Sequence, residues 1–384
     1  MVIIQPKLVG IDSSVFAGWA ADAFSLEVCA RDAARNALAS LLTSDWIPLL
    51  SWHHFEELAC HAEEQVVANR MALLRSLSHI AWIRTSADPT HLGSVVDLLA
   101  AEVEAVLAVA EGEAVFCREA VRASLVRYGT PDELETVRLW RELRPLLQDR
   151  QVRSREIASV AHTGNMQALE RRVLDLAEMH ALADPAASVL FRKQASTLAR
   201  ELSQRGDRRL QNPANVANLF TDGVIQAFRS MKDSGASPLA AFLREFDVPR
   251  EDVTDTMSFD EFAELAARRK RLRIVCRSRN LDLNRIWPHL RYARITSLWV
   301  QEEIRRAQMA TPKASGSDLA DSYLAAFAPY LDAVVVDKRT HEYLSQSCRR
   351  SQAFESQLGR FLKVSSYKQL PQALQPEGRL THKD

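Results

Sequence analysis

The chain has 384 residues, of which 47% are hydrophobic and 26% charged, an ordinary globular composition that excludes wholesale disorder. The 49 basic and 49 acidic residues cancel, so no overall charge indicates a nucleic-acid partner, and any basic surface must be local. Glycine is scarce at 12 residues, which favours long helices over a many-turned β sandwich.

The sequence predicts a cytoplasmic protein that makes no contact with membranes. Its most apolar long stretch, residues 92–110, carries Asp97, Glu102 and Glu104, and a spanning helix tolerates few such charges. The first ten residues lack the basic and apolar regions of a secretory signal. The five cysteines are scattered without CxxC spacing, which argues against a zinc ribbon or disulfide framework and fits a reducing compartment.

In chain order, strands and helices alternate at the start. Short apolar runs at 7–12, 46–52 and 79–83 predict buried strands, and helix-compatible segments at 20–43 and 53–77 lie between them. This alternation is typical of a parallel α/β sheet.

From about residue 86 to 309 the apolar spacing predicts helices. Thr130-Pro131-Asp132-Glu133 and Ser237-Pro238 mark two helix starts. After Pro312, a helix ending near Ala328, a strand at 332–337, a helix at 341–357 and a strand at 361–364 are expected. We therefore predict an α/β domain formed by residues 1–85 and 311–384, split by an all-α insertion at 86–310.

Acidic residues follow the predicted strands. Asp12 follows the first strand, Glu57 lies on the helix after the second, Asp321 lies early in the late helix, and Asp337 follows the valine-rich strand. Asp318 lies three residues before Asp321, on the same helix face. In a parallel sheet with crossover helices these positions share one edge, where ligands bind. Carboxylates gathered there repel one another unless cations lie between them, and Mg²⁺ or Mn²⁺ prefers such oxygen ligands.

This arrangement resembles a PIN-domain nuclease. That family has an Asp after its first strand, a Glu-Leu pair on its second helix, and Asp residues on a late helix and after its fourth strand. The matching segments here are VGIDSS at 9–14, Glu57-Leu58, SDLAD at 317–321 and VVVDKR at 334–339. The stretch from Asp321 to Arg339 is the most specific, and the resemblance leaves the middle of the chain unexplained.

The resemblance implies a PIN-like parallel sheet and hydrolysis of phosphodiester bonds, most often in RNA, with Mg²⁺ or Mn²⁺ activating water. Asp12, Asp321 and Asp337 would bind the metal, and Glu57 would bind it or position water. Lys338 and Arg339 would contact the substrate phosphate. Ser13 or Ser14 would orient Asp12.

Taken singly, each acid also has a structural interpretation. Asp12 alone would be a turn residue or helix cap, and Asp318 a cap near a helix start. Glu57 alone would be a solvated helix acid, as we expect Glu56 to be. Asp332 precedes its strand and is therefore expected at the opposite edge, in a structural role. The ordered set of four acids favours the metal-site interpretation.

Positive charge concentrates at residues 268–294, where ten basic residues accompany one acid, Asp282. Arginines bind phosphates, and aromatics such as Trp287 and Tyr292 stack on unpaired bases. We expect this segment to guide nucleic acid toward the carboxylates; the alternative is a solvated helix whose arginines pair with the acids at 252–264. The residues expected to bind nucleic acid are Arg268, Arg269, Lys270, Arg271, Arg273, Arg277 and Arg279.

The sequence thus predicts a metal-dependent nuclease with RNA favoured over DNA. The helical insertion could dock a protein partner or inhibitor, and a homo-oligomer stays open. Two other functions also stay open: a non-catalytic scaffold that keeps the fold, and a metal-dependent phosphatase that acts on small substrates. No HExxH, GxxxxGK or GxSxG pattern occurs, which disfavours a zinc protease, a P-loop ATPase and a serine hydrolase.

Overall fold

The computed structural model describes residues 6–108, 114–162, 172–173, 186–233, 237–291, 293–309 and 318–375. The chain divides into two compact units. The first comprises Met1–Gln151, Asn284–Gln308 and Leu319–Asp384, and the second comprises Val152–Leu283 and Met309–Asp318.

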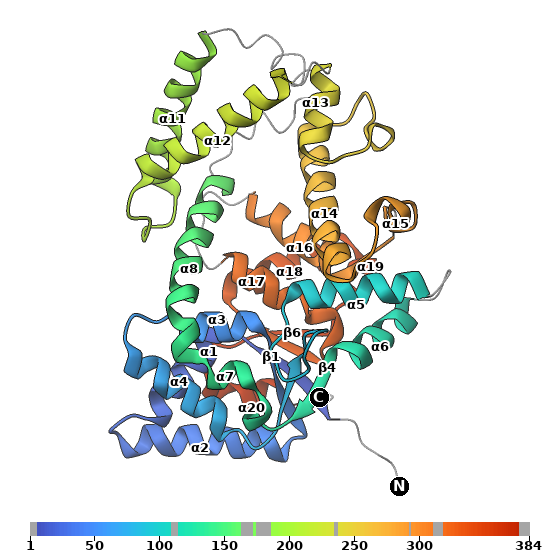
Figure 1. Cartoon of the computed structure of the whole chain (residues 1–384). Helices are drawn as coiled ribbons and strands as arrows, with labels where there is room; N and C mark the ends of the chain where they lie inside the picture. The colour runs from blue at the N-terminus through green and yellow to red at the C-terminus, as the bar shows by residue number, and fades with distance from the viewer. Residues whose placement is uncertain are drawn as a thin grey trace, which may run out of the picture. The chain divides into compact units, whose positions relative to one another are not determined.

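The first unit is α/β, with a mixed sheet of six strands among its described residues (Figure 1). The strands are β1 (Lys7–Ile11), β2 (Trp46–Leu50), β3 (Ile80–Ile83), β4 (Val126–Gly129), β5 (Ala333–Val336) and β6 (Arg360–Lys363). Their order is β4-β3-β2-β1-β5-β6. All neighbouring pairs are parallel except β3 and β4, which are antiparallel. The predicted α/β class and the five predicted strands are confirmed, whereas β4 makes the sheet mixed.

Helices cover both faces of the sheet, because the strands are apolar on both faces. The helical elements of this unit are α1 (Ser13–Ala23), α2 (Val28–Thr43), α3 (Trp52–Ala59), α4 (Glu64–Ser76), α5 (Val95–Ala108), α6 (Ala114–Leu125), η1 (Pro131–Glu133), α7 (Glu135–Arg138), the first part of α8 (Trp140–His162), α15 (Leu283–Leu290), α16 (Thr296–Met309), α17 (Asp318–Ala326), η3 (Ala328–Tyr330), α18 (Lys338–Arg350), α19 (Gln352–Glu355), η4 (Tyr367–Gln369) and α20 (Leu370–Ala373).

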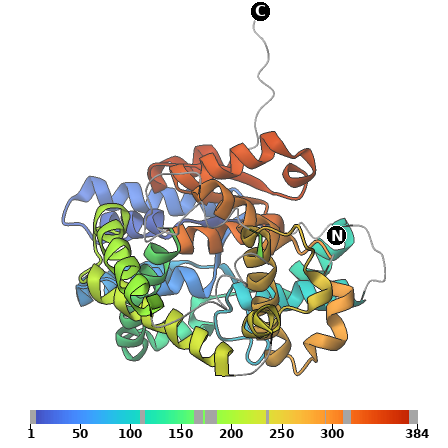
Figure 2. The same ribbon diagram turned by 90° about the horizontal axis from the view of Figure 1, so that it is seen from above.

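Alternating strand residues form two separate cores. Val9 and Ile11 of β1 pack with α1–α4 and with residues of α8 and α20. Leu8 of the same strand faces the opposite side, where α5, α6, α17 and η3 pack. The two ends of the described chain meet in the first core, because η4 and α20 contact α2 (Figures 1 and 2). Tyr367 of η4 stacks on Trp19 of α1 at 5.6 Å between ring centroids.

Described residues of the ranges 86–151 and 284–308, which the sequence placed in the all-α insertion at 86–310, belong to the sheet-bearing unit, and β4 among them pairs with β3. The buried carboxyl of Glu102, on α5, links this helix to the start of α16 and to η3. The Ser297 backbone N–H, at the start of α16, donates to Glu102 Oε1 at 2.8 Å, and the Tyr330 hydroxyl donates to it at 2.5 Å. Burial raises the pKa of Glu102. The favourable field of a helix N-terminus stabilises a carboxylate in this position.

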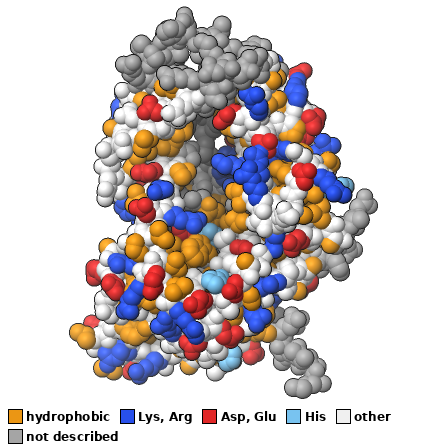
Figure 3. All heavy atoms as spheres, viewed as in Figure 1, with side chains coloured by type: hydrophobic (Ala, Val, Ile, Leu, Met, Phe, Trp, Pro, Cys, Tyr) orange, Lys and Arg blue, Asp and Glu red, His pale blue; other side chains and the backbone are white. Residues whose placement is uncertain are grey.

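The secondary structure described in the second unit is helical, apart from an isolated bridge between Arg172 and Ser258. Its helices are the last part of α8, α11 (Ala186–Arg205), α12 (Pro213–Asp233), α13 (Pro238–Glu245), η2 (Arg250–Asp252) and α14 (Phe259–Ser278). Phe242 of α13 packs on Phe262 of α14, with 5.1 Å between the ring centroids. Lys and Arg side chains gather over α14 (Figure 3).

Both helix starts read from the middle of the sequence are confirmed. Thr130 and Glu133 form a capping box at η1, where the Thr130 N–H donates to Glu133 Oε1 at 2.9 Å. Ser237 caps α13 by accepting from the Ala240 N–H at 3.2 Å. Within the described ranges, no helix combines the length and the apolar character that crossing a membrane would require.

Candidate active site

Asp12 lies where the central strand β1 ends and α1 begins. Its backbone N–H donates to the Val335 carbonyl of β5 at 3.0 Å. Its side chain caps α1 by accepting from the Ser14 N–H at 2.7 Å and from the Ser14 hydroxyl. Only 6% of Asp12 is exposed. This carboxylate is therefore held in one orientation at the carboxyl edge of the sheet, and Ser14 is the serine that fixes it.

Glu57 of α3 lies close to Asp12. The pKa of the Glu57 carboxyl is raised to about 7, mainly by burial and also by the charges of Asp12 and Glu56. A hydrogen bond from Ser13 and the charge of Arg70 act in the opposite direction. The structure thus brings together two of the four predicted acids, and a hydrogen bond links Ser13 of α1 to Glu57 of α3.

The connection after β3 positions α3 and hence Glu57. The Trp52 N–H donates to the Gly93 carbonyl at 2.8 Å, and the Val95 N–H donates to His53 Nε2 at 3.2 Å. Burial lowers the pKa of His53 to about 3, so this ring stays neutral and can accept that bond.

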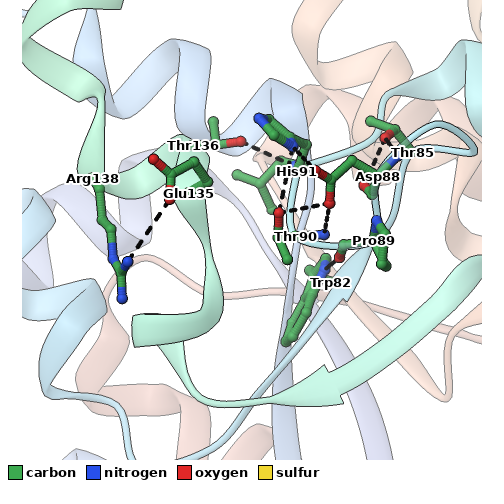
Figure 4. Close-up of polar contacts among 10 residues, drawn as sticks. Trp82, Thr85, Asp88, Pro89, Thr90, His91, Glu135, Thr136 and Arg138 are labelled. Carbon is green, nitrogen blue, oxygen red and sulfur yellow. Dashed lines mark hydrogen bonds and ion pairs between the residues drawn. The ribbon is translucent and has the colours of Figure 1, made fainter.

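Further hydrogen bonds fix residues 88–92 of this connection (Figure 4). The Trp82 indole N–H donates to the Pro89 carbonyl at 2.8 Å, and the Thr90 hydroxyl donates to Asp88 at 2.7 Å. The Leu92 N–H donates to the Thr136 hydroxyl at 3.1 Å, which ties the connection to α7.

Asp337 follows β5, the strand beside β1, so it lies at the same sheet edge as Asp12. Its side chain caps α18 by accepting from the Thr340 N–H at 2.7 Å, and Arg339 Nε lies 3.7 Å from Asp337 Oδ2. Lys338 is exposed at the first position of α18. Asp337 therefore has a structural role in addition to any chemical one.

This capping role predicts different outcomes for two substitutions. Asp337→Ala should lower the free energy of unfolding by about 1 kcal/mol, because it removes the acceptor of the Thr340 N–H. Asp337→Asn should leave stability nearly unchanged, since asparagine is an equally good cap. Urea denaturation of both variants measures the difference, and equal losses would contradict the assigned cap.

Asp321 is half-buried on α17. Two residues further along this helix, Tyr323 lies against His53 of α3 with their ring centroids 4.4 Å apart, so α17 packs beside the helix that carries Glu57. Asp318 is the first residue of α17, and its side chain lies outside the described residues.

The four acids are not assembled into a metal-binding cluster. Over the described ranges, no group of three or more His, Cys, Asp or Glu side chains is placed to hold a metal ion. Asp12 and Glu57 lie close enough for the charge of Asp12 to act on Glu57. Their oxygen donors match the preference of Mg²⁺ and Mn²⁺, and a cation would offset the repulsion between the two charges.

Glu56, beside this pair, forms an ion pair that the sequence did not predict. Glu56 is not a solvated helix acid: it is half-buried, burial raises its pKa, and Arg150 Nε of α8 lies 3.1 Å from Glu56 Oε1. Arg150 is distant in sequence from α3, so only the packing of α8 could reveal this ion pair.

Asp332 has the structural role predicted for it. It accepts a hydrogen bond from the Leu8 N–H at 2.7 Å and a bidentate pair from Arg122 at 3.2 and 2.9 Å. These contacts join α6 to the start of β5, at the edge opposite Asp12.

The basic segment is less available than the sequence suggested. Arg269 is only 3% exposed and pairs with Asp247, so its guanidinium is not on the surface. Trp287 is also buried and cannot stack on a base, and Tyr292 lies outside the described residues. Lys270 and Arg277 are exposed, whereas the other predicted cations are partly exposed: Arg268, Arg271, Arg273 and Arg279.

Comparison of the chain with models of protein families, with curated protein sequences and with solved structures yields no match.

Proposed function

We propose that this chain is a metal-dependent nuclease with a PIN-like fold, interrupted by a helical insertion, that hydrolyses phosphodiester bonds in RNA at the Asp12–Glu57 site. The observation that carries the proposal is the placement of Asp12 at the carboxyl end of β1 with Glu57 of α3 beside it. Asp337 follows the adjacent strand, and α17 with Asp321 packs next to α3. RNA is favoured by the resemblance alone.

In this proposal Asp12 and Glu57 hold the divalent cation. The metal would activate water and offset the charge on the departing oxygen. Ser14 orients the Asp12 carboxylate, and Ser13 orients that of Glu57. Asp321 and Asp337 remain the proposed additional ligands, and the exposed Lys338 is the proposed contact to substrate phosphate.

A cleavage assay tests the proposal. Labelled single-stranded RNA and DNA of one sequence are incubated with the full chain and Mg²⁺, Mn²⁺ or EDTA, and the products are separated by size. We expect internal cleavage of RNA that requires the metal and is slower on DNA. No cleavage with either metal would contradict the nuclease.

One observation favours a second function, a non-catalytic binding protein: the described part of the chain lacks a group of three metal ligands. The same assay separates the two, since this protein would bind RNA without cleaving it. A phosphatase would instead release phosphate from small esters and leave the RNA intact.

A further inference from the structure

One side of α14 presents a row of cations. Lys270, Arg273 and Arg277 are three and four residues apart, so they follow one another along nearly two turns of the helix. Lys270 and Arg277 are exposed, and the Arg273 side chain is 32% exposed. Within the described residues, Lys270 and Arg277 form no ion pair. Their charge is therefore available to a ligand.

The packing beneath this row holds it in place. Asp247, in the turn after α13, pairs with both Arg269 and Arg273, so one carboxylate anchors two guanidinium groups. Arg269 is buried under the row, where the charges of Glu251 and Asp252 also act on it. The acids thus face the buried arginine, and the outer cations retain an excess of positive charge.

An apolar side chain accompanies the exposed cations. Ile274 is 48% exposed and lies four residues after Lys270 and three before Arg277, so it shares their side of the helix. A surface that contacts both phosphates and the faces of unpaired bases requires this combination of cations and apolar area. An acidic peptide would use the cations but would leave Ile274 without a partner.

We propose that the surface formed by Lys270, Arg273, Ile274 and Arg277, here called the α14 surface, binds the backbone of single-stranded RNA. The choice of RNA rests on the proposed nuclease function; the surface itself rests on the row of cations. The side chains act by charge and contact, and take no part in bond cleavage.

RNA binding in EDTA tests this surface without cleavage. Fluorescence anisotropy of a labelled 15-nucleotide single-stranded RNA is measured for the full chain at several salt concentrations. Lys270→Glu with Arg277→Glu should weaken binding at least about tenfold and should reduce the slope of log K against log salt by about 1.4, the value for two lost phosphate contacts. The milder pair Lys270→Gln with Arg277→Gln should weaken binding in the same direction.

Lys193→Glu with Arg200→Glu is the matched control, because it makes the same charge change at exposed positions on α11. Binding close to that of the wild type in this control supports the α14 surface. Equal weakening by both double variants, or none by either, would overturn it, as would tighter binding of a labelled poly-glutamate peptide than of RNA. Metal-dependent cleavage with unchanged binding by the α14 variants would overturn this surface alone, and RNA binding without cleavage would overturn the nuclease alone.

Discussion

Replacing Asp12 with asparagine is expected to slow metal-dependent RNA cleavage by at least about 100-fold. The substitution removes the charge that would attract the cation but keeps an oxygen that can accept from the Ser14 N–H. Asparagine is also as good a helix cap as aspartate, so α1 should keep its start. Single-turnover rates with Mg²⁺ and Mn²⁺ measure the effect.

Asp32→Asn is the matched control, since Asp32 is an exposed acid on α2 whose partner is Arg35 of the same helix. This variant should cleave at the wild-type rate. Thermal unfolding of the Asp12 variant shows whether its fold is intact. A folded Asp12→Asn protein that cleaves as fast as the wild type would remove Asp12 from the reaction.

Replacing Glu57 with glutamine is expected to raise the free energy of unfolding by about 2–3 kcal/mol at pH 8, with little change at pH 4. The pKa of Glu57 is about 7 in the folded chain, against an ordinary value of 4.5. Between these values the folded state binds more protons than the unfolded state. The stability of the wild type therefore falls as the pH rises from about 4.5 to about 7 and stays lower above that. Glutamine is neutral throughout and avoids this loss.

Glu119→Gln provides the control, because Glu119 is exposed on α6. Urea denaturation of the three proteins at pH 4, 6 and 8 gives the comparison. The difference between Glu57→Gln and the wild type should grow with pH, while the control should stay near the wild type. A difference that is constant with pH would mean that Glu57 ionises at its ordinary pKa.

The sequence predicted the sheet strands that lie inside apolar runs. Segments such as that around Val9 or Val334 are buried on both faces, and this burial is recorded in their composition. Strand β4 was missed because it follows α6 without a turn signal and is partly exposed, so its residues form no apolar run.

Part of the candidate site was predictable from the strand assignments. The carboxyl ends of parallel strands meet at one edge, so Asp12 and Asp337 follow from the strand assignments. The burial of Glu57, the ion pair between Glu56 and Arg150, and the burial of Arg269 depend on helix packing. Charge spacing along a sequence does not show which side of a helix packs inward when basic residues occupy both sides, as on α14.

Mn²⁺ binding followed by isothermal titration calorimetry tests most directly whether Asp12 and Glu57 form a cation site. The wild type, Asp12→Asn, Glu57→Gln and the Asp32→Asn control are titrated at pH 7.5 without RNA. The two site variants should lose at least about tenfold in affinity, which corresponds to about 1.4 kcal/mol, while the control should bind as the wild type does. Equal Mn²⁺ affinity in all four proteins, or no binding by the wild type, would contradict the proposed site.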